Sequence, residues 1–354
     1  MANTNNNLHQ AKRDKNDEFY TTYEEIQKEL NHYEDKFEGK TVLCNCDDPF
    51  ESNFCKFFLR NFNYLKLKRL ICTSYNSSPF AGTERDLWHQ DVEIEDRHGF
   101  LLDVSAVPMA NGRGVSDKDI DTLLHSGNCV HDLQGDGDFR SEECIEYLKQ
   151  ADIVVTNPPF SLFKEYVAQL MEYGKKFLII GSQNAITYRD IFTYIKNNEL
   201  WLGYKFGDMS FRVPTYYEAR ETRFWIDEEG NHWRSLGNAC WYTNLDHQKR
   251  HEKIILYKRY NEDNYPKYDN YDAINVARVA EIPQDYNEVM GVPITFLDKY
   301  CPEQFEIFGM SASAGYNKDI VGIDFLGDKD ARPLINGKNT YARLFIKKRA
   351  LEHD

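Results

Sequence analysis

The sequence predicts an α/β protein in which helices cover both faces of a parallel sheet, followed by a second, less regular module. Short apolar runs alternate with helical patterns as far as about residue 181, and aromatic segments of alternating polarity take over from about residue 200. The chain has 354 residues, about twice the usual length of one domain. Hydrophobic residues make up 41% and charged residues 28%, which is typical of a soluble globular protein with a large core.

The first ordered element is predicted from a capping box. Residues 1–16 are rich in Asn and have no hydrophobic period, so we expect a disordered N-terminal arm. Thr22 followed by Glu25 matches the start signal of a helix, and apolar residues then recur at helical spacing. A helix is therefore expected over residues 23–36.

The sheet is predicted from short apolar runs bounded by turns. Strands are expected at residues 41–46, 68–73, 152–156 and 177–181, and helices after residue 54 and at 141–150 and 161–173. The long segment 76–128 is interpreted as an insertion with an extra strand around residues 100–104. Such an alternation of strands and helices indicates a parallel sheet.

The chain changes character after residue 200. The segments LWLGYKF, SFRV, ARETRFWID, NHWRSL, NACWYTNL and KIILYKRY all carry antiparallel-strand signals. Beyond about residue 260 the sequence is rich in Tyr and Asn and punctuated by prolines. We therefore expect a catalytic domain at 17–250 and a separate module at 251–354.

Net charge and cysteine content indicate which partners and which cellular compartment suit the protein. The net charge of −14 opposes generic binding of polyanions, but residues 331–349 carry six cations and no acid. Eight cysteines without a CxxC pair fit reduced thiols. No apolar stretch resembles a membrane span or a signal peptide, so a cytoplasmic protein is expected.

The histidines and cysteines do not predict a metal site. His247 and His251 lie at helical spacing, but no HExxH motif accompanies them, so both are expected at the surface, as are the scattered His125, His131 and His232. Cys44 and Cys46 are interpreted as packing residues of a core strand.

One tetrapeptide indicates a chemical function. The strand at 152–156 ends directly in Asn157-Pro158-Pro159-Phe160, which would arise by chance in roughly 2 of a thousand chains of this length. A purely structural strand-to-helix turn is one interpretation, because Pro is favourable at a helix start. In the functional interpretation, the stiff backbone aims two acceptors, the Asn157 side-chain oxygen and the Pro158 carbonyl, at one point beyond the strand.

Two acceptors at one point suit the amino group of a nucleobase. Its nitrogen lone pair is delocalised into the ring, and accepting both hydrogens favours a pyramidal nitrogen with an exposed lone pair. Phe160 offers a face on which a base can stack once it has left its duplex. No metal or nucleophilic side chain is required for this displacement.

The tetrapeptide resembles motif IV of the S-adenosylmethionine-dependent amino methyltransferases. Residues 17–21 (DEFYT) resemble their N-terminal motif X, residues 48–50 (DPF) the start of cofactor motif I, and residues 138–139 (DF) motif III. This order, followed by a C-terminal module, is similar to the gamma arrangement. More closely, NCDDP at 45–49, WYTNL at 241–245, PITFL at 293–297, PEQFEI at 302–307 and INGK at 335–338 resemble the EcoRI-type adenine-specific DNA methyltransferases.

The resemblance implies a Rossmann-like methyltransferase fold and transfer of a methyl group from S-adenosyl-L-methionine to N6 of an adenine flipped out of double-stranded DNA. It also implies a C-terminal target-recognition module, a monomer, and a cognate restriction endonuclease in the same system. The implied catalytic residues are Asn157, Pro158, Pro159 and Phe160. The implied cofactor-binding residues are Tyr20, Thr21, Asp47, Asp48, Pro49, Phe50, Asp138 and Phe139. The basic C-terminal stretch supplies the expected DNA contacts, Lys338, Arg343 and Lys347.

The sequence departs from the family pattern in two places. Residues 51–54 (ESNF) stand where motif I usually continues into glycines, and no acid follows the second strand to hold the ribose hydroxyls. Tyr75, by stacking, or Asn76, by hydrogen bonding, is a candidate there, and a plain loop is the other interpretation of this segment. Asp47 and Asp48 have a second interpretation as a helix N-cap pair. Two other functions stay open at this point: methylation of an amino group of RNA or of a protein glutamine, and an inactive DNA-binding or DNA-mimicking protein.

Overall fold

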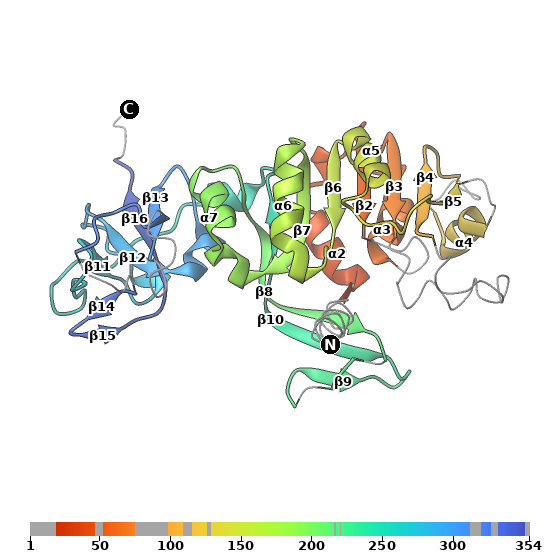
Figure 1. The fold of residues 1–354 in the computed structure, drawn as a ribbon. Helices are drawn as coiled ribbons and strands as arrows, with labels where there is room; N and C mark the ends of the chain where they lie inside the picture. Colours follow the sequence, from red (N-terminus) through yellow and green to blue (C-terminus); the bar gives the residue numbers. More distant parts are fainter. Residues whose placement is uncertain are drawn as a thin grey trace, which may run out of the picture. The chain divides into compact units, whose positions relative to one another are not determined.

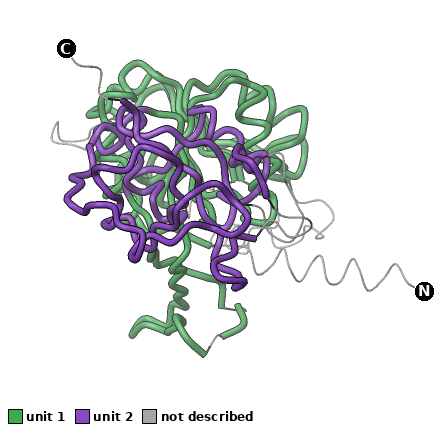
Figure 2. The backbone as a smooth tube through the Cα atoms, turned by 90° about the vertical axis from the view of Figure 1, so that its left-hand side faces the viewer, with its two compact units in different colours: residues 1–183, 205–245 green, residues 184–204, 246–354 purple. Residues whose placement is uncertain are grey.

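The computed structural model describes residues 19–46, 52–74, 98–108, 115–125, 129–215, 217–219, 221–311, 320–326 and 332–350. The chain divides into two compact units, shown in green and purple in Figure 2. Unit 1 comprises residues 1–183 and 205–245, and unit 2 comprises residues 184–204 and 246–354. The division at 245/246 lies close to the boundary predicted at 250/251, but residues 184–204 group with unit 2.

The central feature of unit 1 is a mixed sheet (Figure 1). The described residues form ten strands of this sheet, in the order β1-β8-β10-β7-β6-β2-β3-β4-β5, with β9 paired to β10. The strands are β1 (Tyr20–Thr21), β2 (Thr41–Asn45), β3 (Arg69–Thr73), β4 (Phe100–Val104), β5 (Val130–Asp132), β6 (Ile153–Thr156), β7 (Lys176–Ser182), β8 (Trp201–Val213), β9 (Phe224–Ile226) and β10 (His232–Thr243).

The sheet is parallel only in its centre. β3, β2, β6 and β7 are parallel neighbours, whereas β4 and β5 on one side and β10 on the other join antiparallel. Every residue of β2 and β6 is buried, as expected for central strands covered on both faces. The prediction of an α/β sheet is therefore confirmed, with antiparallel strands at its flanks.

Helices cover both faces of this sheet. They are α2 (Tyr23–Leu30), α3 (Asn53–Asn61), α4 (Asp117–His125), α5 (Glu142–Gln150) and α6 (Phe163–Glu172), the last preceded by a 3₁₀ turn, η3 (Phe160–Leu162). In Figure 1, α5 and α6 lie in front of the sheet, and α2 and α3 lie behind it. The predicted capping box is present, because Thr22 Oγ1 accepts from the Glu25 backbone N–H at 3.2 Å.

Some sequence-based boundaries were wrong. The helix predicted over 23–36 ends at Leu30, where Asn31 and His32, weak helix formers, lead into a separate 3₁₀ turn, η1 (Glu34–Lys36). The segments LWLGYKF and SFRV form one continuous strand, β8, and NHWRSL and NACWYTNL likewise form β10. No strand forms at residues 253–260, where Ile255 is 87% exposed and has no apolar surface to cover it.

Unit 2 contains a smaller sheet and a hairpin. The sheet order is β11-β12-β16-β13, from β11 (Ile274–Asn275), β12 (Met290–Pro293), β16 (Arg343–Lys348) and β13 (Phe305–Met310). The hairpin pairs β14 (Leu334–Ile335) with β15 (Lys338–Asn339). Helix α7 (Arg189–Lys196) and the 3₁₀ turns η5 (Gln248–His251), η6 (Val279–Glu281) and η7 (Ile294–Lys299) belong here, whereas η4 (Gln183–Thr187) lies at the junction with unit 1. Of the helices described, none has the length and apolar character needed to span a bilayer.

Candidate active site

The Asn157-Pro158-Pro159-Phe160 segment lies at the carboxyl edge of the central strands. β6 ends at Thr156, and α6 begins only at Phe163, so the tetrapeptide crosses this edge in extended and 3₁₀ conformation. Pro158 is buried, and Phe160 is half-buried. Open α/β sheets bind ligands at this edge.

The Asn157 amide is held from one side only. Its Nδ2 donates a hydrogen bond to the Phe19 backbone carbonyl, 138 residues earlier in the chain. A carbonyl can only accept, so this contact turns Oδ1 the other way. Oδ1 is buried and accepts no hydrogen bond from any described residue. A buried acceptor of this kind costs about 1–3 kcal/mol, which a donor on a bound molecule would recover.

Aromatic rings surround the same point. The Phe19 ring lies 5.4 Å from that of Phe160, 5.6 Å from that of Phe211 and 6.1 Å from that of Tyr217. Phe211 and Tyr217 are buried, whereas Phe160 keeps part of its surface open. The rings pack around Phe19, whose carbonyl bonds to Asn157, and Phe160 follows Asn157 by three residues with part of its ring exposed.

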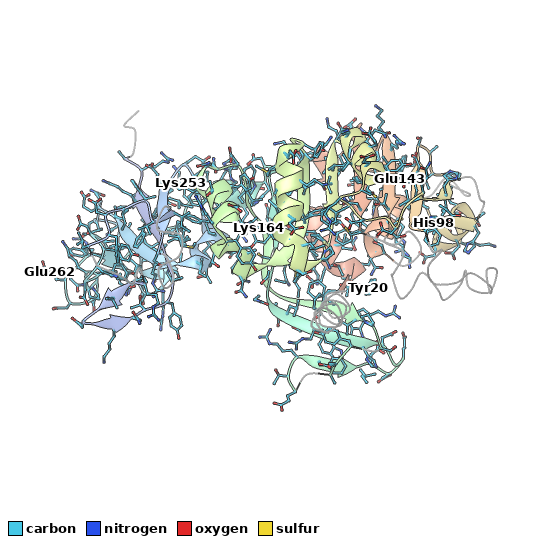
Figure 3. All side chains as sticks on the ribbon, in the orientation of Figure 1. Tyr20, His98, Glu143, Lys164, Lys253 and Glu262 are labelled. Atoms are coloured by element: carbon cyan, nitrogen blue, oxygen red, sulfur yellow. The ribbon has the colours of Figure 1, made fainter. Side chains whose placement is uncertain are left out.

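Tyr20 and Thr21 connect this point to the start of α3. They form β1, which pairs with Phe211 and Arg212 of β8, and Figure 3 shows Tyr20 on the side where β8 and β10 leave the sheet. The Thr21 carbonyl accepts from Asn53 Nδ2 at 2.7 Å. Its hydroxyl is buried without a partner among the described residues, as is that of Thr73 at the end of β3. Two such hydroxyls fit a polar ligand at this edge.

Asp138 and Phe139 lie before α5. Arg140 Nη2 donates to Asp138 at 2.6 Å, and this hydrogen bond lowers the pKa of the Asp138 carboxyl. The Phe139 ring is only 4% exposed and meets the Tyr166 ring edge-on at 5.0 Å. Phe139 is thus mainly a packing residue in this structure, and only Asp138 has a polar group near the surface.

A buried network at the same edge was missed by the sequence analysis. Tyr166 donates from its hydroxyl to Asn45 Oδ1, and Thr156 Oγ1 donates to the Asn45 carbonyl. Asn45 ends β2, so the network joins the ends of β2 and β6 to α6. Asn45 begins the NCDDP string, which was the available signal. Asp47, Asp48, Pro49 and Phe50 lie outside the described residues, as do Tyr75 and Asn76.

The three cations expected to contact DNA lie in unit 2 and differ in exposure. Lys338 is exposed on the β14–β15 hairpin, and Lys347 is half-buried with its Nζ 3.3 Å from Glu288. Arg343 is only 9% exposed, and its guanidinium donates to Asn275 Oδ1 at 3.2 Å and to two backbone carbonyls. An interior position of this kind does not suit direct contact with a phosphate.

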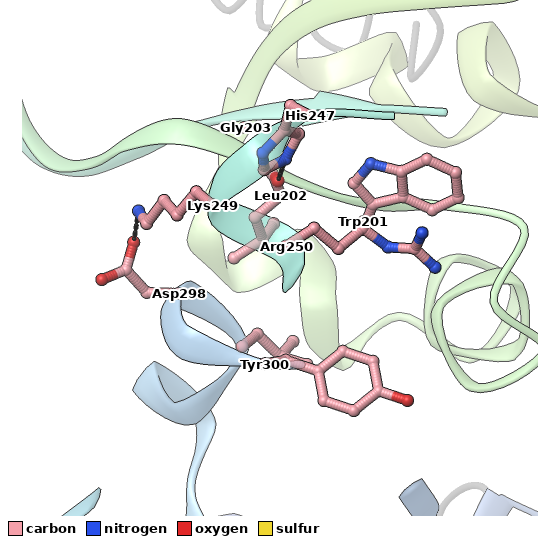
Figure 4. A pocket seen from close by; sticks show the side chains of 9 residues that line it. Trp201, Leu202, Gly203, His247, Lys249, Arg250, Asp298 and Tyr300 are labelled. Carbon is pink, nitrogen blue, oxygen red and sulfur yellow. Dashed lines mark hydrogen bonds and ion pairs between the residues drawn. The ribbon is translucent and has the colours of Figure 1, made fainter. Parts of the chain in front are cut away.

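A pocket in unit 2 also gathers charged and aromatic groups (Figure 4). Its cations are neutralised: Lys249 Nζ lies 2.5 Å from Asp298, and the Arg250 guanidinium, stacked 3.8 Å over Trp201, pairs with Asp246. His247, predicted at the surface, is only 6% exposed, and burial lowers its pKa to about 4. We interpret this pocket as structural.

Comparison with known proteins identifies the family of the chain. The model of a family described as adenine-specific methyltransferase EcoRI matches residues 7–349. The chain belongs to this family. It is 46% identical to Type II methyltransferase M.EcoRI of Escherichia coli, over 99% of this chain and 98% of the relative. No solved structure matches it significantly.

Two mycoplasma proteins are similar over equal lengths. Type II methyltransferase M.MgeORF184P of Mycoplasma genitalium is 37% identical, over 97% of this chain and 99% of the relative. Type II methyltransferase M.MpnI of Mycoplasma pneumoniae is 36% identical, over 97% and 98%. The resemblance to EcoRI-type methyltransferases noted in the sequence is therefore confirmed over nearly the whole chain.

Proposed function

We propose that this EcoRI-family protein is a site-specific DNA adenine N6-methyltransferase that takes the methyl group from S-adenosyl-L-methionine. The observation that carries the proposal is the Asn157 side-chain oxygen, buried without a hydrogen-bond partner among the described residues, three residues before the half-buried Phe160. Family membership agrees with this chemistry.

Catalysis is assigned to the Asn157-Pro158-Pro159-Phe160 segment. A flipped-out adenine stacks on Phe160 and donates its two amino hydrogens to Asn157 Oδ1 and the Pro158 carbonyl. Both contacts strengthen as the nitrogen becomes positive, so they favour the transition state over the ground state. Pro159 keeps the backbone stiff, because its ring fixes φ. The amino nitrogen would gain the methyl group as the bond from that carbon to the sulfonium sulfur breaks, which would leave a neutral thioether, and one N–H proton would then pass to water.

The residues at the carboxyl edge fit the proposed cofactor. When bound, S-adenosyl-L-methionine supplies a methyl group activated by a sulfonium. The hydroxyls of Thr21 and Thr73, which have no partner among the described residues, and the carboxylate of Asp138 offer acceptors for its ammonium and hydroxyl groups. Tyr20 and the 47–50 segment complete the proposed cofactor site on the strength of the family resemblance.

Unit 2 is proposed to read the duplex. Lys338 and Lys347 are the remaining candidates for phosphate contacts there, since Arg343 is occupied inside the unit. We propose in addition that the chain acts as a monomer beside a cognate restriction endonuclease, as a cytoplasmic protein that is prokaryotic or phage-encoded.

Methyl transfer to nucleic acid tests the proposed function. The full chain is incubated with S-adenosyl-L-methionine labelled in its methyl group and duplex DNA of mixed sequence, and the DNA is digested to nucleosides. We expect the label in N6-methyladenine. Label in RNA or protein substrates instead, with none in DNA, would contradict the proposal, and so would the absence of heat on calorimetric titration with the cofactor.

A further inference from the structure

Unit 1 carries a second polar feature that methyl transfer does not use. β8 and β10 continue beyond the parallel centre of the sheet into an antiparallel arm that β9 extends (Figure 1). One side of this arm forms an open groove lined by Arg223, Arg234, Ser235, Leu236, Gly237 and Asn238. Leu236 is its one large apolar residue, so the groove suits a charged ligand better than an apolar one.

Arg223 is held across the groove floor in a strained conformation. Its φ of +59° is unusual for a residue other than Gly, and its Nη1 lies 3.1 Å from Asp208. A Cβ at Gly237 would come within 2.1 Å of Nη1, so the guanidinium lies directly over the Gly237 backbone. The absence of a side chain at Gly237 makes room for the arginine, and such strain often marks a binding site.

Arg234 brings a second cation to the same groove. Its Nη1 donates to the carbonyls of Thr222 at 2.6 Å and Arg223 at 3.0 Å, and its buried Nε meets no acceptor within the described part of the chain. Both of these partners are neutral carbonyls, so its charge is not cancelled by them. Among the described residues, Asp208 is the acid that pairs with Arg223, so the groove has an excess of donors.

The groove lies near the methyl-transfer site. Asn238 Nδ2 donates to Ser182 Oγ at 3.2 Å, and Ser182 ends β7, the neighbour of β6. Because Thr156 pairs with Ile179, Asn157 is about level with Ile180. Because Ala239 pairs with Ser182, Asn238 is level with Gln183, three residues beyond Ile180. With strands about 4.8 Å apart and residues rising about 3.3 Å, Asn238 lies roughly 10 Å across and roughly 10 Å along the sheet from Asn157. A few nucleotides bridge this separation, since phosphates recur about every 3.4 Å along one strand.

We propose that Arg223 and Arg234 bind a backbone phosphate of the DNA strand that carries the target adenine. This inference rests on the proposed function and adds a DNA contact in unit 1 to those expected in unit 2. Two guanidiniums with unused donors match the geometry of phosphate oxygens. A chain of net charge −14 also needs such local cations to hold DNA next to the site.

The salt dependence of DNA binding tests this inference. Affinity for a duplex of mixed sequence is measured from 50 to 200 mM salt for the full chain and for Arg223→Ala and Arg234→Lys. The slope of log K against log salt is negative, and loss of one phosphate contact reduces its magnitude by about 0.9. For Arg223→Ala we expect this shallower slope and binding about tenfold weaker at low salt. Arg234→Lys retains the charge and should weaken binding less.

Two further variants separate the contact from general effects of charge and folding. Gly237→Ala leaves all charges in place but displaces the Arg223 guanidinium, so it should weaken binding in the same direction. Lys149→Ala removes a half-exposed cation that is paired with Glu146. Lys149 lies in the last turn of α5, just before β6 begins, at the edge of the sheet opposite to the methyl-transfer site. This variant should change affinity less than twofold. Calorimetric titration with the cofactor verifies that each variant is folded.

The outcomes distinguish the inference from the function on which it rests. Wild-type slope and affinity in Arg223→Ala and Gly237→Ala, as in Lys149→Ala, would overturn the phosphate contact while leaving methyl transfer intact. Failure of the wild-type chain to bind or methylate duplex DNA would instead overturn the proposed function itself.

Discussion

Replacing Asn157 with alanine tests the central contact of the site. The change removes the buried Oδ1 acceptor and also the Nδ2 donor to the Phe19 carbonyl. A hydrogen bond to a group that becomes charged contributes about 1.5–3 kcal/mol, and a preorganised transition-state contact about 2.7–4 kcal/mol. A barrier higher by about 2–4 kcal/mol corresponds to a rate lower by about 30- to 1,000-fold.

The assay is single-turnover transfer of a labelled methyl group to DNA, with cofactor affinity measured separately by calorimetry. We expect the transfer rate of Asn157→Ala to fall within that range while the cofactor still binds. Asn157→Asp is the matched control, because it retains an acceptor but places an oxygen opposite the Phe19 carbonyl. Its transfer rate should therefore lie between those of the wild type and Asn157→Ala. A near-normal transfer rate in Asn157→Ala would refute the assignment.

Three further predictions concern stability. Burial lowers the pKa of His247 to about 4, whereas in the unfolded chain this histidine takes up a proton as the pH falls below about 6.5. Between pH 7 and pH 5 the free energy of unfolding of the wild type should therefore fall by about 2 kcal/mol, a loss that His247→Gln should not show. Equal pH dependence of the two proteins in denaturant titrations would contradict this. Tyr166→Phe leaves the buried Asn45 Oδ1 without its donor and should cost about 1–3 kcal/mol in the same titrations; no change would show that the bond contributes nothing. The register between β13 and β16 shifts at a bulge between Ile307 and Gly309. Gly309→Ala would place a Cβ 1.7 Å from the Val321 carbonyl, so it should lower the melting temperature of unit 2 by several degrees, and an unchanged transition would show that this bulge adapts.

The parts of the fold that the sequence predicted are those fixed by local pattern. α5, β6, α6 and β7 lie within two residues of their predicted bounds, because their apolar periods are strong and Ser141 caps α5 as a start signal should. The tetrapeptide was found for the same reason, since its position depends only on the end of one strand.

The parts that the sequence did not predict depend on contacts distant in the chain. The bond between Asn157 and the Phe19 carbonyl joins residues 138 positions apart, and the burial of His247 depends on the hydrogen bond of its Nε2 to the Leu202 carbonyl at 2.9 Å. The segment at 253–260 has strand propensity, but beyond an isolated bridge at Lys258 its described residues do not join a ladder. Tertiary context outweighed propensity there.

The bond from Asn157 to the Phe19 carbonyl also limits how the N-terminus can be shortened. The acceptor is a backbone atom, so substitution of the Phe19 side chain does not delete it, whereas removal of the residue does. Trimming to start at residue 22 would abolish both this acceptor and β1 while leaving α2 and every strand of the parallel centre in place. A chain shortened in this way is expected to fold and to be deficient in methyl transfer, although every residue of the tetrapeptide is still present.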